Sequence, residues 1–218
     1  KGVVRLTKHS NDNSANNKKP LIVFSRYSPY MAVDVDKLEN ADGKNLPLQA
    51  VTSLCRCGCS SQKPYCDGTH SKIGFVGTPG EHRPPCNSKV YVGKTITIHD
   101  NRRICSHSAE CINGLPKVFD LSKKPWIDPD GADASAIIAI IERCPSGALS
   151  YTINDEHHVE WDNDEAVIKV SEDGPLCCSG GIIIKDADQT VPQAASHYTL
   201  CRCGKSANKP FCDGAHLD

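Results

Sequence analysis

The sequence predicts an α+β fold in which two small β-rich repeats flank a central α+β segment. Three observations lead to this expectation: an internal repeat, short β-branched segments before each of its copies, and an isoleucine-rich stretch between the copies. Repeats are sought first because a repeated supersecondary unit determines the architecture of the whole chain. The expected units are 20–75, 90–162 and 165–218, with 71–89 as a linker rich in Gly and Pro.

Sixteen residues that begin at Cys55 return from Cys201 at a constant offset of 146 residues, and 11 of the 16 positions are identical. Segments rich in branched residues and bounded by Gly, Pro and Asp precede each copy, as is typical of strands joined by turns. The expected strands are Leu21–Phe24 and Tyr30–Val35 in the first copy, and Val167–Val170 and Leu176–Ile184 in the second.

The central segment has a different character. Apolar and polar residues alternate over Val90–Ile98, which predicts one half-buried strand. A helix is expected over Ala132–Arg143 because isoleucines recur there at helical spacing. Ala148–Ile153 and Val159–Trp161 are expected to form a hairpin around an Asn-Asp turn. This order of strand, loop, helix and hairpin indicates an α+β domain.

Composition excludes several classes of function. The chain has 218 residues and a formal net charge of −1, so no electrostatic feature favours a nucleic acid. No apolar run approaches the ~20 residues that span a bilayer, and no secretory leader opens the chain, so we expect a cytoplasmic protein without a membrane partner. Thirteen cysteines, an odd number, are then expected to serve mainly as metal or cluster ligands rather than in disulfides.

Each repeat copy carries the spacing Cys-x-Cys-x8-Cys-x3-His. Three thiolates and an imidazole in a turn-rich segment are soft donors suited to a metal. We expect Asp67 and Asp213 to cap short helices whose first turn holds the histidine. A structural zinc is an alternative, although zinc fingers usually bring paired cysteines at wider spacing. The candidate ligands are Cys55, Cys57, Cys66 and His70 in the first copy and Cys201, Cys203, Cys212 and His216 in the second.

The runs Cys66-Asp67-Gly68-Thr69-His70 and Cys212-Asp213-Gly214-Ala215-His216 resemble the CDGSH iron–sulfur domain, also called the NEET family. The resemblance implies one [2Fe–2S] cluster per copy, held by its three cysteines and one histidine. It also implies that the two copies pair as an intrachain pseudo-dimer within a monomer, since many proteins with one such motif form homodimers.

The histidine ligand predicts particular chemistry. Replacing a thiolate by a neutral imidazole removes negative charge from a cluster and raises its reduction potential. An imidazole takes up a proton near neutral pH, and a protonated imidazole cannot ligate iron. Such clusters are therefore expected to be redox-active and labile in acid.

A further candidate site lies between the copies. Cys105, Cys111 and Cys144 follow the ferredoxin spacing of clustered cysteines and a remote Cys-Pro, with Ser108 at the middle position. Three thiolates suit a [3Fe–4S] cluster, or a [4Fe–4S] cluster whose fourth ligand is not cysteine, for which His107 is a candidate. Together with Cys144-Pro145-Ser146-Gly147-Ala148-Leu149, these residues resemble the divergent single-cluster ferredoxin domain. Alternatively, the three thiols are buried as small hydrophobic groups without a cluster.

The sequence favours an electron-transfer protein that meets a redox partner protein. Two alternatives stay open: cluster storage, transfer to an apo-acceptor or redox and pH sensing, and a zinc-stabilised interaction module. We do not expect an enzyme, because no nucleotide-binding loop, flavin motif or catalytic triad order is visible. The remaining histidines are expected at the surface, and the four remaining cysteines as buried non-ligand thiols, namely Cys59, Cys86, Cys177 and Cys178.

Overall fold

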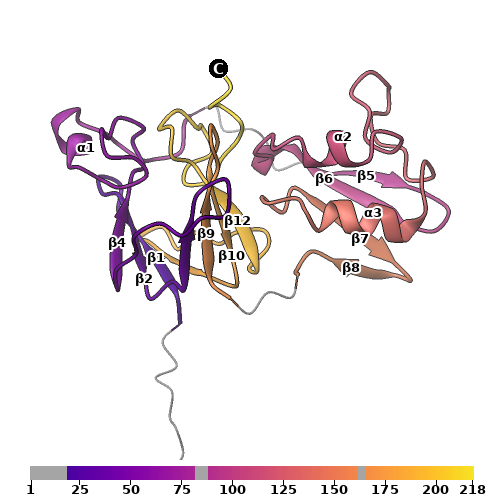
Figure 1. Cartoon of the computed structure of the whole chain (residues 1–218). Coiled ribbons are helices and arrows are strands. Elements are labelled where there is room, and N and C mark those ends of the chain that lie inside the picture. The colour runs from indigo at the N-terminus through magenta and orange to yellow at the C-terminus, as the bar shows by residue number, and fades with distance from the viewer. Residues whose placement is uncertain (1–18, 82–87, 162–164) are drawn as a thin grey trace, which may run out of the picture.

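The computed structural model describes residues 19–81, 88–161 and 165–218. Within these ranges the chain forms three four-stranded sheets and three short α-helices, which is a β-rich α+β class (Figure 1). No helix in the described ranges is long and apolar enough to cross a bilayer.

The strands of the two repeats begin at equivalent positions. Every strand of the second copy starts 146 residues after its counterpart in the first, so the sequence repeat is also a structural repeat. The strands are β1 (Leu21–Val23), β2 (Tyr30–Val33), β3 (Lys37–Glu39) and β4 (Val51–Leu54), followed by β9 (Val167–Val170), β10 (Leu176–Ser179), β11 (Ile183–Lys185) and β12 (His197–Leu200).

The two copies exchange their third strands. One sheet has the order β11-β1-β2-β4 and the other β12-β10-β9-β3. β11 runs parallel to β1, with Ile183 opposite Leu21. β3 runs parallel to β9, with Lys37 opposite Val167. Each sheet therefore contains three strands of one copy and one strand of the other, and neither sheet is complete within a single copy.

A single hydrophobic core joins the two repeat sheets. Ile22 and Leu38 of the first copy belong to the same buried cluster as Ile168 and Leu176 of the second. Tyr30 adds a polar connection, because its hydroxyl donates to the backbone oxygens of Cys201 and Pro210, each at 3.1 Å. The second motif is thus held in part by a residue of the first copy.

The expected strand Leu176–Ile184 is wrong in its extent. The chain turns between β10 and β11 at Gly180 and Gly181, whose φ angles are +79° and +65°. A Cβ at Gly180 would lie 2.0 Å from the Glu165 backbone oxygen, so a side chain has no room at this turn.

The central segment forms its own sheet, with the order β5-β6-β7-β8. Helix α3 is shorter than predicted, and it covers the sheet through the fully or nearly fully buried Ile137, Ile140 and Ile141. The elements are β5 (Ser88–Val92), β6 (Thr97–Asn101), a 3-10 turn (Arg102–Ile104), α2 (Glu110–Gly114), α3 (Ala134–Ile141), β7 (Leu149–Ile153) and β8 (Glu156–His158).

The prediction of one strand over Val90–Ile98 is wrong. β5 and β6 form a hairpin, and the chain reverses where the Gly93 N–H donates to the Ile96 backbone oxygen at 3.0 Å. The predicted hairpin around Asn154 and Asp155 is confirmed, with positive φ angles of 51° and 62° at these residues. Two such angles are typical of a type I′ turn, and the returning strand is β8 rather than Val159–Trp161.

We predict that Tyr30→Phe destabilises the fold by about 1–3 kcal/mol, because the buried hydrogen bonding of its hydroxyl to the backbone oxygens of Cys201 and Pro210 is lost. Tyr27→Phe is the control: Tyr27 is 65% exposed, so its change is expected within about 0.5 kcal/mol. Urea unfolding of the protein as purified measures both. Equal midpoints for the two variants would contradict the role assigned to Tyr30.

Candidate metal sites

The same backbone hydrogen bonds fix the cysteines of both motifs. The backbone N–H of the first motif cysteine donates to the backbone oxygen of the loop proline. The backbone N–H of the third cysteine donates to a backbone oxygen of the strand that precedes the motif. The pairs are Cys55 to Pro64 (2.7 Å) and Cys66 to Ser53 (2.9 Å), and Cys201 to Pro210 (2.8 Å) and Cys212 to Thr199 (3.0 Å). Each loop is therefore folded back onto the end of β4 or β12.

The motif aspartates brace the loops. Asp67 accepts hydrogen bonds from the backbone N–H groups of Ser61 and Thr69, which lower its pKa. Asp213 accepts from Ala207 and Ala215 in the same way. These aspartates stabilise the conformation of the loops through hydrogen bonds. The thiols and the imidazole are left available as metal ligands.

Two expectations about the histidine helices need correction. His70 lies in a four-residue helix, α1 (Thr69–Lys72), as predicted, but the N-cap residue is Gly68 rather than Asp67. His216 lies in a turn and not in a helix.

Each motif presents its four donors as two pairs. The first two cysteines lie together, and the third cysteine lies beside the histidine. In the described part of the chain, no three His, Cys, Asp or Glu side chains converge on a point that could hold one metal ion. The separations are Cys55 Sγ–Cys57 Sγ 3.9 Å, Cys66 Sγ–His70 Nδ1 3.2 Å, Cys201 Sγ–Cys203 Sγ 3.6 Å and Cys212 Sγ–His216 Nδ1 3.5 Å.

The two motif loops contact each other through glycines. A Cβ at Gly58 would lie 2.3 Å from the Cys203 backbone oxygen, and one at Gly204 would lie 2.4 Å from that of Cys57. Both glycines also have positive φ, at +80° and +79°. Glycine is required at both positions for the loops to approach this closely.

The motif arginines donate hydrogen bonds to backbone oxygens outside the motif loops. Arg56 is 3% exposed, and its guanidinium donates to the backbone oxygens of Ser25 and Gly77, each at 2.6 Å. Arg202 donates to the backbone oxygens of Ser171 and Gly174. Arg202 thus ties its motif to an earlier turn of its own copy, and Arg56 ties its motif to an earlier turn and to Gly77, which follows the motif.

Burial keeps several motif thiols in the neutral form. It raises the pKa of Cys212 to about 12 and also raises that of Cys57. Cys203 differs, because hydrogen bonding from Cys201 lowers its pKa. A metal binds the thiolate, so loading these sites displaces protons from the buried thiols.

The central cysteines meet in one cavity. Cys105, Cys111 and Cys144 all line a cavity of about 360 Å³ whose walls are mostly apolar. Burial raises the pKa of Cys111 to about 11 and raises that of Cys105. Three thiols facing one enclosed space fit a soft cofactor held by three thiolates.

Non-thiol donors line the same cavity. His107 and Ser108 are among them, as sequence reasoning anticipated. Burial lowers the pKa of His107, and neighbouring Arg102 and His216 lower it further. Asp100 was not anticipated: it is fully buried, burial raises its pKa, and its Oδ1 lies 4.0 Å from Arg102 Nη1. Nothing in the sequence distinguishes this aspartate from an ordinary one at a strand end.

The remaining thiols do not all follow the prediction of burial. Cys178 is buried and Cys177 is partly buried, but Cys59 is exposed. Cys86 lies outside the described residues. Among the histidines expected at the surface, His197 is instead 6% exposed and stacks on Trp161, with ring centroids 5.3 Å apart.

The fold and these donor sets define an iron–sulfur protein, and comparisons with known proteins agree. The family described as "Iron-binding zinc finger CDGSH type" matches residues 27–71 and 173–217, and "Divergent 4Fe-4S mono-cluster" matches 91–154. The chain belongs to the CDGSH iron–sulfur family, with a divergent 4Fe–4S domain between its two motifs.

Two curated relatives are similar to part of the chain. Both are called "Uncharacterized protein YjdI", one from Escherichia coli strain K12 and the other from Escherichia coli O157:H7. Each is 44% identical over 63 residues, which is 29% of this chain and 83% of the relative. No solved structure matches the chain.

The buried thiols predict a pH dependence for the metal-free protein. The pKa values of Cys111 and Cys212 are raised from 9.0 to about 11 and about 12 in the folded chain. Between pH 9 and 12 the folded state therefore retains thiol protons that the unfolded state releases. The stabilisation that these thiols contribute is complete below pH 9 and is lost as pH rises from 9 to 12. The melting temperature of chelator-treated protein across this range measures the effect. A melting temperature that rises with pH would contradict it.

Proposed function

We propose that the chain is an electron-transfer protein that holds two [2Fe–2S] clusters by three Cys and one His each, and one further cluster at the central site. The paired geometry of the donors carries this proposal. A [2Fe–2S] cluster divides its protein ligands between two irons, whereas a structural zinc draws four ligands to one ion. Two separate pairs per motif suit two irons.

The protein residues have distinct roles in this proposal. Cys55 and Cys57 hold one iron of the first site, while Cys66 and His70 hold the other. The second site is built equivalently from Cys201, Cys203, Cys212 and His216. When bound, a [2Fe–2S] cluster supplies a reversible one-electron step. The single histidine favours the reduced form because it contributes no negative charge.

The central site is proposed to hold a [4Fe–4S] or [3Fe–4S] cluster on Cys105, Cys111 and Cys144. The enclosed cavity and the match to a 4Fe–4S domain support this assignment. A fourth ligand for a [4Fe–4S] cluster is available from the wall residues His107, Ser108 or Asp100. None of these is a cysteine, which fits the divergence of this domain.

We also propose that the two motifs form a pseudo-dimer within a monomer, and that the protein is not an enzyme. The reciprocal exchange of β3 and β11 supports the first point, because each copy completes the sheet of the other. The reciprocal contacts of Gly58 and Gly204 place the two motif loops side by side. The expected partner is a redox protein that docks near these loops.

We predict that protein purified without oxygen contains iron and acid-labile sulfide, with an electron paramagnetic resonance spectrum of reduced [2Fe–2S] clusters. Cys55→Ser and Cys201→Ser are each expected to remove one of the two [2Fe–2S] contributions, and Cys59→Ser is the control because Cys59 has no counterpart in the second motif. Zinc without iron would overturn the proposal.

Acid is predicted to bleach the visible absorbance of the [2Fe–2S] clusters between pH 8 and 5, because protonated imidazole is lost as a ligand. His70→Cys and His216→Cys should each move part of the bleaching to lower pH. Absorbance during a stepwise pH titration measures the change. Bleaching at the wild-type pH in the double variant would exclude the imidazole as its cause.

A further inference from the structure

The central domain is joined to the second motif by polar contacts. Arg103 Nε donates to the side-chain oxygen of Asn208 at 3.1 Å, and the Asn208 amide donates to the Arg103 backbone oxygen at 3.1 Å. Asn101 also donates to Gln193. Figure 1 shows the central sheet beside β10 and β12, with α1 and β4 on the far side of the repeat body.

His107 connects the central cavity to the second motif. It lines the cavity of Cys105 and Cys111, and its ring lies against Gly214. A Cβ at Gly214 would lie only 2.0 Å from His107 Nδ1, so only glycine at this position leaves room for the imidazole ring. Gly214 stands between the proposed ligands Cys212 and His216, and Leu217 also lines the central cavity.

Among the described residues, the first motif has no equivalent contact. Gly68 corresponds to Gly214 and has a similar φ, +83° against +87°, yet no described atom lies within 4 Å of a Cβ built there. The two glycines have similar backbone conformations, but only Gly214 lies against His107. Gly68 therefore serves as an internal control for Gly214.

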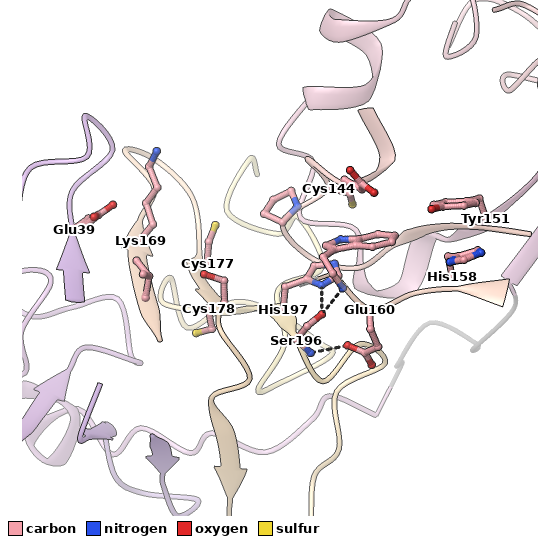
Figure 2. A pocket seen from close by; sticks show the side chains of 15 residues that line it. Glu39, Cys144, Tyr151, His158, Glu160, Lys169, Cys177, Cys178, Ser196 and His197 are labelled. Carbon is pink, nitrogen blue, oxygen red and sulfur yellow. Dashed lines mark hydrogen bonds between the residues drawn. The ribbon is translucent and has the colours of Figure 1, made fainter. Parts of the chain in front are cut away.

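A second connection lies on another face of the central site. Cys144 and Cys177 both line a cavity of about 830 Å³ between β10 and the end of α3, as Figure 2 shows. On the side of the second motif, Cys177 Sγ lies 3.4 Å from Ser171 Oγ, and a Cβ at Gly174 would lie 3.4 Å from Ser171 Oγ and 3.8 Å from His216 Nε2. The first-copy counterpart of Cys177 is Met31.

We propose that the central site is directly coupled to the second CDGSH site across the contact of His107 with Gly214, and that the first CDGSH site has no such direct coupling to the central site. This inference rests on the proposed function, since it requires clusters at both sites. With clusters bound at both sites, one electron would pass from the reduced central cluster to the oxidised second [2Fe–2S] cluster, with no bond formed or broken. The histidine ligand of the second site favours this direction when the fourth ligand of the central cluster is not an imidazole.

The first test uses electron paramagnetic resonance of the full, loaded, dithionite-reduced protein. His70→Cys and His216→Cys assign the two [2Fe–2S] signals, since each variant alters the signal of its own site. The signal of the second site should be broadened by magnetic interaction with the central cluster, and Cys105→Ser should remove the broadening. Cys105→Ser should leave the first-site signal unchanged, because only the second site contacts the central one. Equal narrowing of both signals by Cys105→Ser, or of neither, would overturn the pairing.

The second test measures electron arrival at the second site after flash reduction by a photoreduced flavin, a one-electron donor. Gly214→Ala should slow this step, because a Cβ at Gly214 would displace the His107 ring. Gly68→Ala, with a similar positive φ and no described atom within 4 Å of the new Cβ, should match wild type. A wild-type rate in Gly214→Ala would overturn the role of the contact.

The failure of this inference is distinguishable from failure of the proposed function. Iron and sulfide sufficient for three clusters, without broadening of the second-site signal, would overturn the pairing alone. Iron and sulfide for two [2Fe–2S] clusters only would overturn the pairing together with the central part of the proposed function.

Discussion

Two short parallel strand pairings, β1 with β11 and β3 with β9, determine the arrangement of the whole repeat body. Because each copy lends a strand to the other, neither sheet nor the shared core forms from one copy alone. The same pairing brings the motif loops into contact at Gly58 and Gly204. The environment of each proposed cluster therefore depends on residues from the opposite copy, as the hydrogen bonds from Tyr30 to Cys201 and Pro210 illustrate.

The inserted central domain breaks the symmetry of the repeats. A symmetric body would give two equivalent sites, but here His107 occupies space at Gly214 and nothing described occupies it at Gly68. Position along the chain does not explain the difference, since the insertion is joined to both copies. The difference arises from side-chain contacts such as that of Arg103 with Asn208, where the first copy has Gln62. The two near-identical motifs therefore have different surroundings.

Sequence reasoning predicts most of the local structure and little of the long-range pairing. The repeat offset and the turn residues locate the strands, and the motif spacing identifies the donors. The strand exchange is not visible in the sequence, because three-residue strands such as β3 and β11 are too short for a pattern of apolar and polar residues to specify a partner strand. The hairpin at Gly93 was missed because alternation continued across it. Asp100 was missed because its burial depends on tertiary packing, which no local pattern records.

The central claim is that each motif divides its four donors between two irons. Anomalous diffraction from crystals grown without oxygen, collected on either side of the iron and zinc absorption edges, tests it directly. The account predicts two adjacent iron peaks in each motif, one beside Cys55 and Cys57 and the other beside Cys66 and His70, with the equivalent pair in the second copy. A single zinc peak bound by all four side chains of a motif would contradict it.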